Sequence, residues 1–220
     1  ACLMAEPDLV ARCVEAMRNA TDLPVTVKHR IGIDDLDSDA LLTAFVDRVA
    51  AAGASRFAVH ARKAWLEGLD PKQNRTIPPL QHERVVALKR RRPELVIELN
   101  GGLESPDDCL EALEICDGAM VGRAAYSHPL RWTSVDAVIF DERPRTILAS
   151  DVVTGLIPHA EAHLQRGGRL WDLCRHLVQL VEGVRGARHW RRDLGNRAQR
   201  PGADLRILEE AGRQLRDAGL

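Results

Sequence analysis

Two kinds of hydrophobic spacing alternate from residue 6 to about residue 130. Apolar residues three or four positions apart predict amphipathic helices, and short runs rich in Val, Ile and Leu predict buried strands. The helical spacing covers residues 6–19, 40–52 and 83–91 and the segment that follows Ser105. The strand-like runs cover residues 24–28, 56–60, 95–100 and 118–122. This alternation predicts an α/β fold in which βα units form a parallel sheet.

The pattern changes after about residue 145, where the strand-like runs stop. Residues 159–166, 169–184 and 203–218 have helical spacing, and glycine-rich joints separate them. We therefore predict two domains, a β/α domain at residues 1–147 and a small all-helical domain at residues 148–220.

The composition excludes several classes of protein. No uncharged apolar run approaches the roughly 18–20 residues that cross a bilayer, and no signal peptide is recognisable, so we expect a cytoplasmic protein without membrane contact. Five cysteines, an odd number with no C-x-x-C pair, argue against a disulfide scaffold or a zinc ribbon. His159 and His163 lie four residues apart without an H-E-x-x-H motif or a third ligand, so we expect no metal.

The net charge of −1 hides an uneven distribution. Residues 166–200 contain nine arginines and three acidic residues, a balance of +6 that leaves −7 for the remainder. Such a basic segment indicates an anionic partner, with nucleic acid first, although a solvated helical face explains the charge alone equally well. Trp171 and Trp190 lie among these arginines, which favours RNA.

Polar or glycine residues follow each strand-like run. The four strand ends read Lys28-His-Arg30, His60-Ala-Arg62, Asn100-Gly-Gly102 and Gly122-Arg123. Reactive residues gather at the carboxyl ends of parallel strands, and glycine-bearing loops there expose N–H groups to a phosphate. The strand ends therefore predict a site for a phosphorylated cofactor. The alternatives are a simple turn at Gly101-Gly102, a Lys28 that lies along the rim, and a structural His60.

Residues 61–80 form a long loop with no helical or strand-like spacing. It contains Trp65 and four cations, which are Arg62, Lys63, Lys72 and Arg75. Loops of this length in compact domains are usually functional or disordered, and these residue types favour ligand contact.

The sequence closely resembles the A-type tRNA-dihydrouridine synthases. The matching segments are PVTVKHRIGID (24–34), FAVHARKAWLEGLDPKQNRTIPPL (57–80), ELNGG (98–102), MVGRAAYSHP (120–129), GARHWRRDL (186–194) and GAD (202–204). The resemblance implies an FMN-bound (β/α)8 TIM barrel followed by a helical domain that grips tRNA. It also implies that NADPH reduces FMN, which then reduces a flipped uridine of the D-loop, at positions 20 and 20a, to 5,6-dihydrouridine.

Site residues follow from the same resemblance. It implies that Lys28 and His60 contact the flavin and its ribityl chain. The residues that would hold the FMN phosphate are Asn100, Gly101, Gly102, Gly122 and Arg123. Arg62 would lie near the uracil, and Lys72 and Arg75 would touch tRNA. Arg188 and Arg191, one helical turn apart, would face the RNA backbone together.

The chain departs from the family at one important motif. The family's catalytic cysteine lies in an Asn-x-x-x-Cys-Pro-Ser motif that is absent here, so we predict no catalytic residue in this chain. A complete barrel takes about 250 residues. We therefore expect a C-terminal fragment that contains the last four βα units, is inactive alone and belongs to an enzyme that is a monomer when complete. The alternatives are a non-catalytic RNA-binding remnant and a phosphosugar-binding barrel protein.

Overall fold

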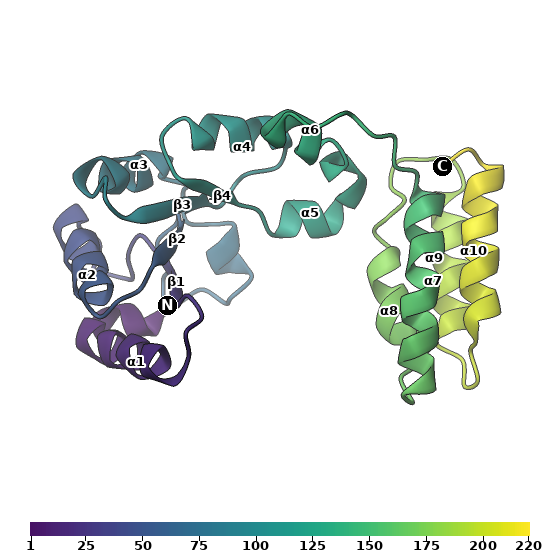
Figure 1. The fold of residues 1–220 in the computed structure, drawn as a ribbon, viewed down its shortest axis with the longest axis horizontal. Helices are drawn as coiled ribbons and strands as arrows, with labels where there is room; N and C mark the ends of the chain where they lie inside the picture. The colour runs from purple at the N-terminus through teal and green to yellow at the C-terminus, as the bar shows by residue number, and fades with distance from the viewer. The chain divides into compact units, whose positions relative to one another are not determined.

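The computed structural model describes residues 1–220, which form two compact units, Ala1–Gly122 and Arg123–Leu220 (Figure 1). The first unit is a parallel sheet of four strands with helices, and the second consists of helices and turns. The predicted α/β class with a parallel sheet is therefore confirmed. The predicted boundary at residue 147 falls inside the second unit, and as an assignment of functional domains it stays a prediction. None of the helices combines the length and the apolar character that a membrane span requires.

Helices connect the successive strands of the first unit. The strands are β1 (Thr26–Arg30), β2 (Arg56–His60), β3 (Val96–Asn100) and β4 (Gly118–Met120). The helices are α1 (Pro7–Ala20), α2 (Asp39–Ala51), α3 (His82–Arg91) and α4 (Pro106–Leu113), with short 3-10 turns η1 (Cys2–Ala5) and η2 (Gln73–Arg75). The predicted ranges agree with these bounds to within two residues. The start of α4 is also as expected, because the Ser105 hydroxyl accepts a hydrogen bond from the Asp108 N–H (3.1 Å) and Pro106 is the first helical residue.

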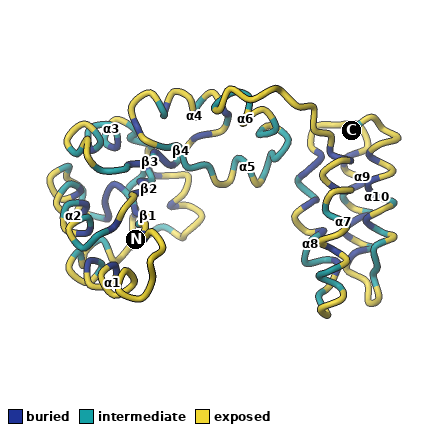
Figure 2. Tube along the Cα trace, viewed as in Figure 1, coloured by how far each residue is buried: buried dark blue, intermediate teal, exposed yellow.

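The strands lie side by side in chain order, β1-β2-β3-β4, so β1 and β4 each pair on one side only. Neighbouring strands are in register, with Phe57 paired to Val27 and to Ile97. Because side chains alternate along a strand, these residues share one face of the sheet. Phe57, Val59 and Ile97 on this face are completely buried. Figure 2 shows buried segments along the strands. Packing against the helices thus fixes which strand residues face the opposite side.

The second unit has its own apolar core. Its elements are α5 (Arg123–Ser127), η3 (Pro129–Trp132), α6 (Val135–Phe140), α7 (Ala149–Gln165), α8 (Leu170–Leu177), α9 (Ala187–Ala198) and α10 (Leu205–Asp217). Buried residues of α7 to α10 form one cluster, which includes Val153, Leu170, Leu194 and Leu208. Trp190 is buried in this cluster, and its Nε1–H donates to the Ala211 carbonyl (3.1 Å), which joins α9 to α10.

The predicted helices of this region need three corrections. Helix α7 begins at Ala149, ten residues before the predicted start at residue 159. The prediction began the helix after Pro158, because proline disfavours the interior of a helix. Helix α8 ends at Leu177 rather than at residue 184. Helix α9 was not among the predicted ranges, because its buried stripe of Ala187, Trp190, Leu194 and Ala198 provides only about one apolar residue per turn among arginines.

We expect Trp190→Ala to lower the free energy of unfolding of the second unit by about 3–5 kcal/mol, because it leaves a cavity and removes the Nε1–H donor. Urea unfolding followed by far-UV circular dichroism measures this loss. Trp171→Ala is the matched control, since Trp171 is only half-buried against the same cluster. If both variants lost the same free energy of unfolding, burial of Trp190 in the core would not explain the loss, and the prediction would be contradicted.

Candidate functional site

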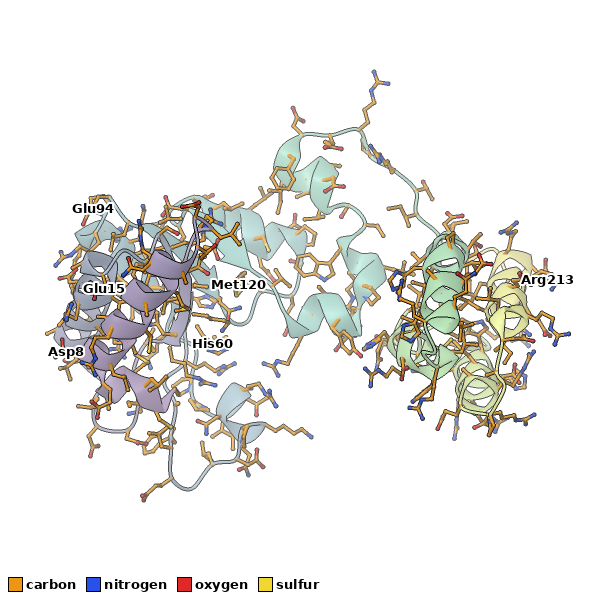
Figure 3. The ribbon with its side chains drawn as sticks, turned by 60° about the horizontal axis from the view of Figure 1, so that its bottom comes forward. Asp8, Glu15, His60, Glu94, Met120 and Arg213 are labelled. Carbon is orange, nitrogen blue, oxygen red and sulfur yellow. The ribbon has the colours of Figure 1, made fainter.

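The sheet face opposite the packed helices carries the polar strand ends. The last row across this face contains Arg30, His60, Asn100 and Met120, of which His60 and Met120 are labelled in Figure 3. The row before it contains Lys28, Ala58, Glu98 and Gly118. The structure therefore brings three predicted site residues, Lys28, His60 and Asn100, to one face at the carboxyl end of the sheet.

Lys28 is a partly desolvated cation at this face. Its pKa is lowered because burial disfavours the charged ammonium, and the nearby Arg30 guanidinium lowers it further. The Glu98 carboxylate of the same row is paired with Arg56 (2.7 Å). Lys28 remains exposed on this face, so it is accessible to an anionic or hydrogen-bond-accepting ligand.

The glycine turn after β3 lies against His60. Gly101 and Gly102 have φ angles of +103° and +77°, in the left-handed region that favours glycine. A Cβ on Gly101 would lie 3.2 Å from His60 Nε2, and one on Gly102 would collide with Leu80. The ring nitrogen Nε2 of His82 lies 2.7 Å from the Gly101 carbonyl oxygen and holds the turn in place. His60 and this turn are thus neighbours in space as well as in the predicted site.

Asn100 is buried and ties neighbouring segments together. Its Nδ2 donates to the Met120 carbonyl at the end of β4 (2.6 Å), and its own carbonyl accepts from the Ala61 N–H (2.9 Å). The side-chain amide therefore has a structural partner that the prediction did not include. Its contact with a phosphate stays a prediction.

Gly122 follows β4 and has open space around it. A Cβ built on this residue would meet no protein atom within 4 Å. Packing within the chain therefore does not require glycine here, whereas the close approach of a ligand would. Arg123 comes next in the sequence as the first residue of α5.

The loop at residues 61–80 is ordered, and two polar residues hold it. The Arg30 guanidinium donates to the carbonyls of Lys63 (2.9 Å) and Asn74 (2.8 Å). The buried Asn74 amide bonds both backbone groups of Trp65, accepting from its N–H (2.8 Å) and donating to its carbonyl (2.7 Å). The sequence placed Arg30 at a strand end without assigning it a role, and Asn74 was not selected. The alternation of residues along a strand could have identified Arg30, because it shares a face with Lys28.

The cations predicted to touch substrate differ in exposure. Arg62 is half-buried, and its guanidinium donates to the Pro78 carbonyl within the same loop. Lys72 and Arg75, immediately before and at the end of η2, are exposed. The predicted contacts of all three residues stay predictions.

An ionic network fixes the base of this loop. Asp37 accepts from Lys63 (2.8 Å) and from Arg84 of α3 (2.5 Å), and Arg84 also bonds Asp39 (2.8 Å). Burial alone would raise the pKa of Asp37, but the hydrogen bonds and positive charges of Lys63 and Arg84 outweigh it and lower that pKa. The network thus links the segment after β1, the long loop and α3.

His29 occupies the opposite, buried face of β1. Its Nδ1 lies 2.7 Å from the Arg30 carbonyl oxygen and donates to it, and its ring packs 5.1 Å from Phe45 and 6.0 Å from Phe57. Desolvation is the main cause that lowers its pKa to about 4. His29 is therefore a neutral core residue, although it stands between two residues of the open face.

Helix α9 carries the two arginines predicted to contact RNA. Arg188 is exposed, whereas Arg191 is half-buried and its Nε donates to the Ala187 carbonyl (3.4 Å). Arg197 of the same helix pairs with Asp193 (3.2 Å) and with Glu210 of α10 (2.7 Å). Arg188 is thus available to an external anion, and contact of either arginine with RNA stays a prediction.

The cysteines and histidines noted in the sequence have structural surroundings. All five cysteines are free, and Cys109, Cys116 and Cys174 are buried. Burial raises the pKa of these three thiols, that of Cys174 to about 11, so they are poor nucleophiles. His163 Nε2 lies 3.3 Å from Asp172 Oδ2, and the structure gathers no group of three or more His, Cys, Asp or Glu side chains that could hold a metal.

Comparison with known proteins identifies similar sequences over nearly the whole chain. The family model described as dihydrouridine synthase (Dus) matches residues 1–215. The tRNA-dihydrouridine(20/20a) synthase of Shewanella oneidensis is 49% identical over 211 residues, which cover 96% of this chain and 63% of that protein. The synthase of the same name from Synechocystis sp. is 47% identical over 220 residues, 100% of this chain and 64% of that protein. This chain therefore spans less than two thirds of the length of these curated relatives.

The buried His29 predicts a pH dependence of stability. The unfolded chain takes up a proton near pH 6.5, whereas the folded chain does so only near pH 4, so stability falls as the pH drops through this window and is insensitive to His29 above it. By pH 4 the loss attributable to His29 is about 3 kcal/mol. Urea unfolding of the parent and of His29→Leu between pH 4 and 7 measures it. Parallel pH profiles for the two proteins would contradict the prediction.

Proposed function

Because this chain belongs to the dihydrouridine synthase family, we propose that it supplies part of the cofactor and tRNA surfaces of a flavin-dependent tRNA-dihydrouridine synthase. The reaction is the FMN- and NADPH-dependent reduction of uridine to 5,6-dihydrouridine in the D-loop of tRNA, at positions 20 and 20a. One observation carries the proposal. Lys28, His60 and the Gly101-Gly102 turn meet at the carboxyl end of one sheet face, where a family member needs its cofactor site.

The strand order supports a partial TIM barrel. All four strands are parallel and follow chain order, with an apolar face packed on helices and a polar face opposite. A doubly wound sheet would instead reverse its strand order. We assign residues 1–147 to the C-terminal half of an FMN-binding barrel and residues 148–220 to a helical tRNA-binding domain. The 220 residues do not contain the cysteine motif of the family, so we assign binding surfaces to this chain and no catalytic cysteine.

The residues present fit FMN. The open space at Gly122 allows close approach to the backbone, the left-handed turn at Gly101 follows the same edge of the sheet, and Lys28 provides an exposed cation on this face. When bound, FMN supplies the hydride for uracil reduction and is reduced again by NADPH. Lys28 and His60 bind the flavin and ribityl groups. Three groups would hold the phosphate. They are the backbone of Gly101, Gly102 and Gly122, the Arg123 side chain, and Asn100 at the end of β3.

Each unit contributes tRNA contacts of its own, the first through the long loop and the second through α9. Arg62 lies near the uracil, and the exposed Lys72 and Arg75 contact the tRNA backbone. Arg188 and Arg191 contribute phosphate contacts from α9. Reduction requires the target base to leave the folded RNA, because its reacting atoms are otherwise stacked. The complete enzyme acts as a monomer, without a metal or a membrane.

Binding measurements test this function directly. We expect the chain to retain a tRNA transcript on filters, with an affinity that falls steeply with salt, and to bind FMN. Retention of tRNA without FMN binding would favour a non-catalytic RNA-binding remnant. A flat salt response without tRNA retention would favour a phosphosugar-binding barrel protein and contradict the proposal.

Replacement of Arg188 tests the role of α9. Arg188→Ala should reduce by about one the slope of log affinity for tRNA against log salt, since one phosphate contact is lost, and should leave FMN binding unchanged. The control is Arg206→Ala, because Arg206 is exposed but paired with Asp204 (2.7 Å) in a local ion pair. If Arg188→Ala lost tRNA affinity and FMN affinity equally, the proposal that tRNA and FMN bind to separate surfaces would be contradicted.

Replacement of Gly122 tests the cofactor cradle. Gly122→Ala should weaken FMN binding by about tenfold or more, about 1.4 kcal/mol, without lowering the melting temperature, because the added methyl meets no protein atom. Gly155→Ala is the matched control, since its Cβ also meets no atom within 4 Å but lies in α7. Titration of FMN fluorescence measures both variants. An FMN affinity equal to that of the parent would exclude Gly122 from the site.

A further inference from the structure

Trp65 is an exposed aromatic residue on a firmly held backbone. The residue as a whole is 46% exposed. Its backbone N–H and carbonyl are nevertheless both hydrogen-bonded to the side-chain amide of Asn74. The next N–H, that of Leu66, donates to Asp34 Oδ1 (2.8 Å). Asp34 itself has a φ of +39°, which is uncommon for a residue other than glycine. The loop thus presents Trp65 with little backbone freedom, which lowers the entropic penalty of binding a partner.

A cation covers one face of the Trp65 ring. The Lys63 ammonium lies 4.6 Å from the ring centroid and pairs at the same time with Asp37 (2.8 Å). Lys63 is therefore held in place and its charge is compensated. Lys63 lies over one face of the ring, and Trp65 remains 46% exposed beside it.

The surroundings of Trp65 combine positive charge and apolar surface. Besides Lys63, whose charge Asp37 compensates, residues 61–80 contain the cations Arg62, Lys72 and Arg75 against Glu67 and Asp70, a net charge of +1. Leu66 and Ile77 of the same loop are also exposed, by 40% and 59%. An aromatic face within a cationic loop matches a nucleobase attached to a phosphate backbone, because bases stack on aromatic rings while cations neutralise phosphates.

We propose that Trp65 is a stacking platform for an unpaired nucleobase of the bound tRNA. This inference rests on the proposed function and adds to it a residue that recognises the flat face of a base rather than a charge. Such stacking is tolerant of base identity. Trp65 therefore positions the RNA on the loop, and the neighbouring cations Lys72 and Arg75 contribute the salt-dependent part of binding.

The test compares tRNA binding by the parent chain, Trp65→Leu and Trp65→Phe across a range of salt concentrations. Trp65→Leu should weaken binding about 5- to 150-fold, the range for the loss of one stacked base, with an unchanged salt slope because no charge is removed. Trp65→Phe should recover most of the affinity, since a phenyl ring still stacks. Phe140→Leu is the matched control, because Phe140 is 69% exposed but belongs to α6 of the second unit.

Each other outcome would overturn the inference in a distinguishable way. Unchanged tRNA affinity in Trp65→Leu, while the parent binds tRNA, would overturn stacking alone and point to a protein partner for this surface. Equal losses in the Leu and Phe variants, with a lowered melting temperature in both, would show that Trp65 only supports the loop. If the parent chain itself retains no tRNA, the proposed function and this inference both fail.

Discussion

The placement of the polar groups depends on the burial of the other face of the sheet. Phe57, Val59 and Ile97 are completely buried beneath the helices. His29 is buried beside them and is neutral, because burial lowers its pKa to about 4. Because the strands are in register, this packing aligns four strand ends in one row on the open face. A shift of one residue in β1 would exchange His29 for Lys28 and place an ammonium in the core. The apolar packing therefore positions the chemistry, and the polar residues then connect the site to the long loop.

Local patterns in the sequence were sufficient to predict the strands, most helix bounds of the first unit and the glycine turn after β3. Each of these depends on residues that are close in the sequence. The roles of Arg30, Asn74 and His82 depend on contacts across 9 to 44 residues, from Asn74 to Trp65 as the shortest to Arg30 with the Asn74 carbonyl as the longest. Periodicity contains no information about such partners. Asn100 illustrates the limit, because its position at the strand end was predicted, while its bond to Met120 became visible only with the strands paired.

The net charge of the basic segment does not show which of its arginines already have partners within the fold. Nine arginines between residues 166 and 200 indicated an anionic partner for this segment. Arg197 instead connects α9 to α10 through two carboxylates, and Arg191 bonds its own helix, whereas Arg188 is exposed. A count of charges treats these residues alike, but the charge that a partner meets depends on which of them the fold already uses.

The free sides of β1 and β4 have a further consequence. Each of these strands presents unpaired N–H and C=O groups along one side, because the sheet ends there. Backbone groups of this kind are a template for another strand. In a closed barrel, neighbouring strands would occupy both edges. Both edges of the sheet are therefore positions at which a further strand can add through backbone hydrogen bonds.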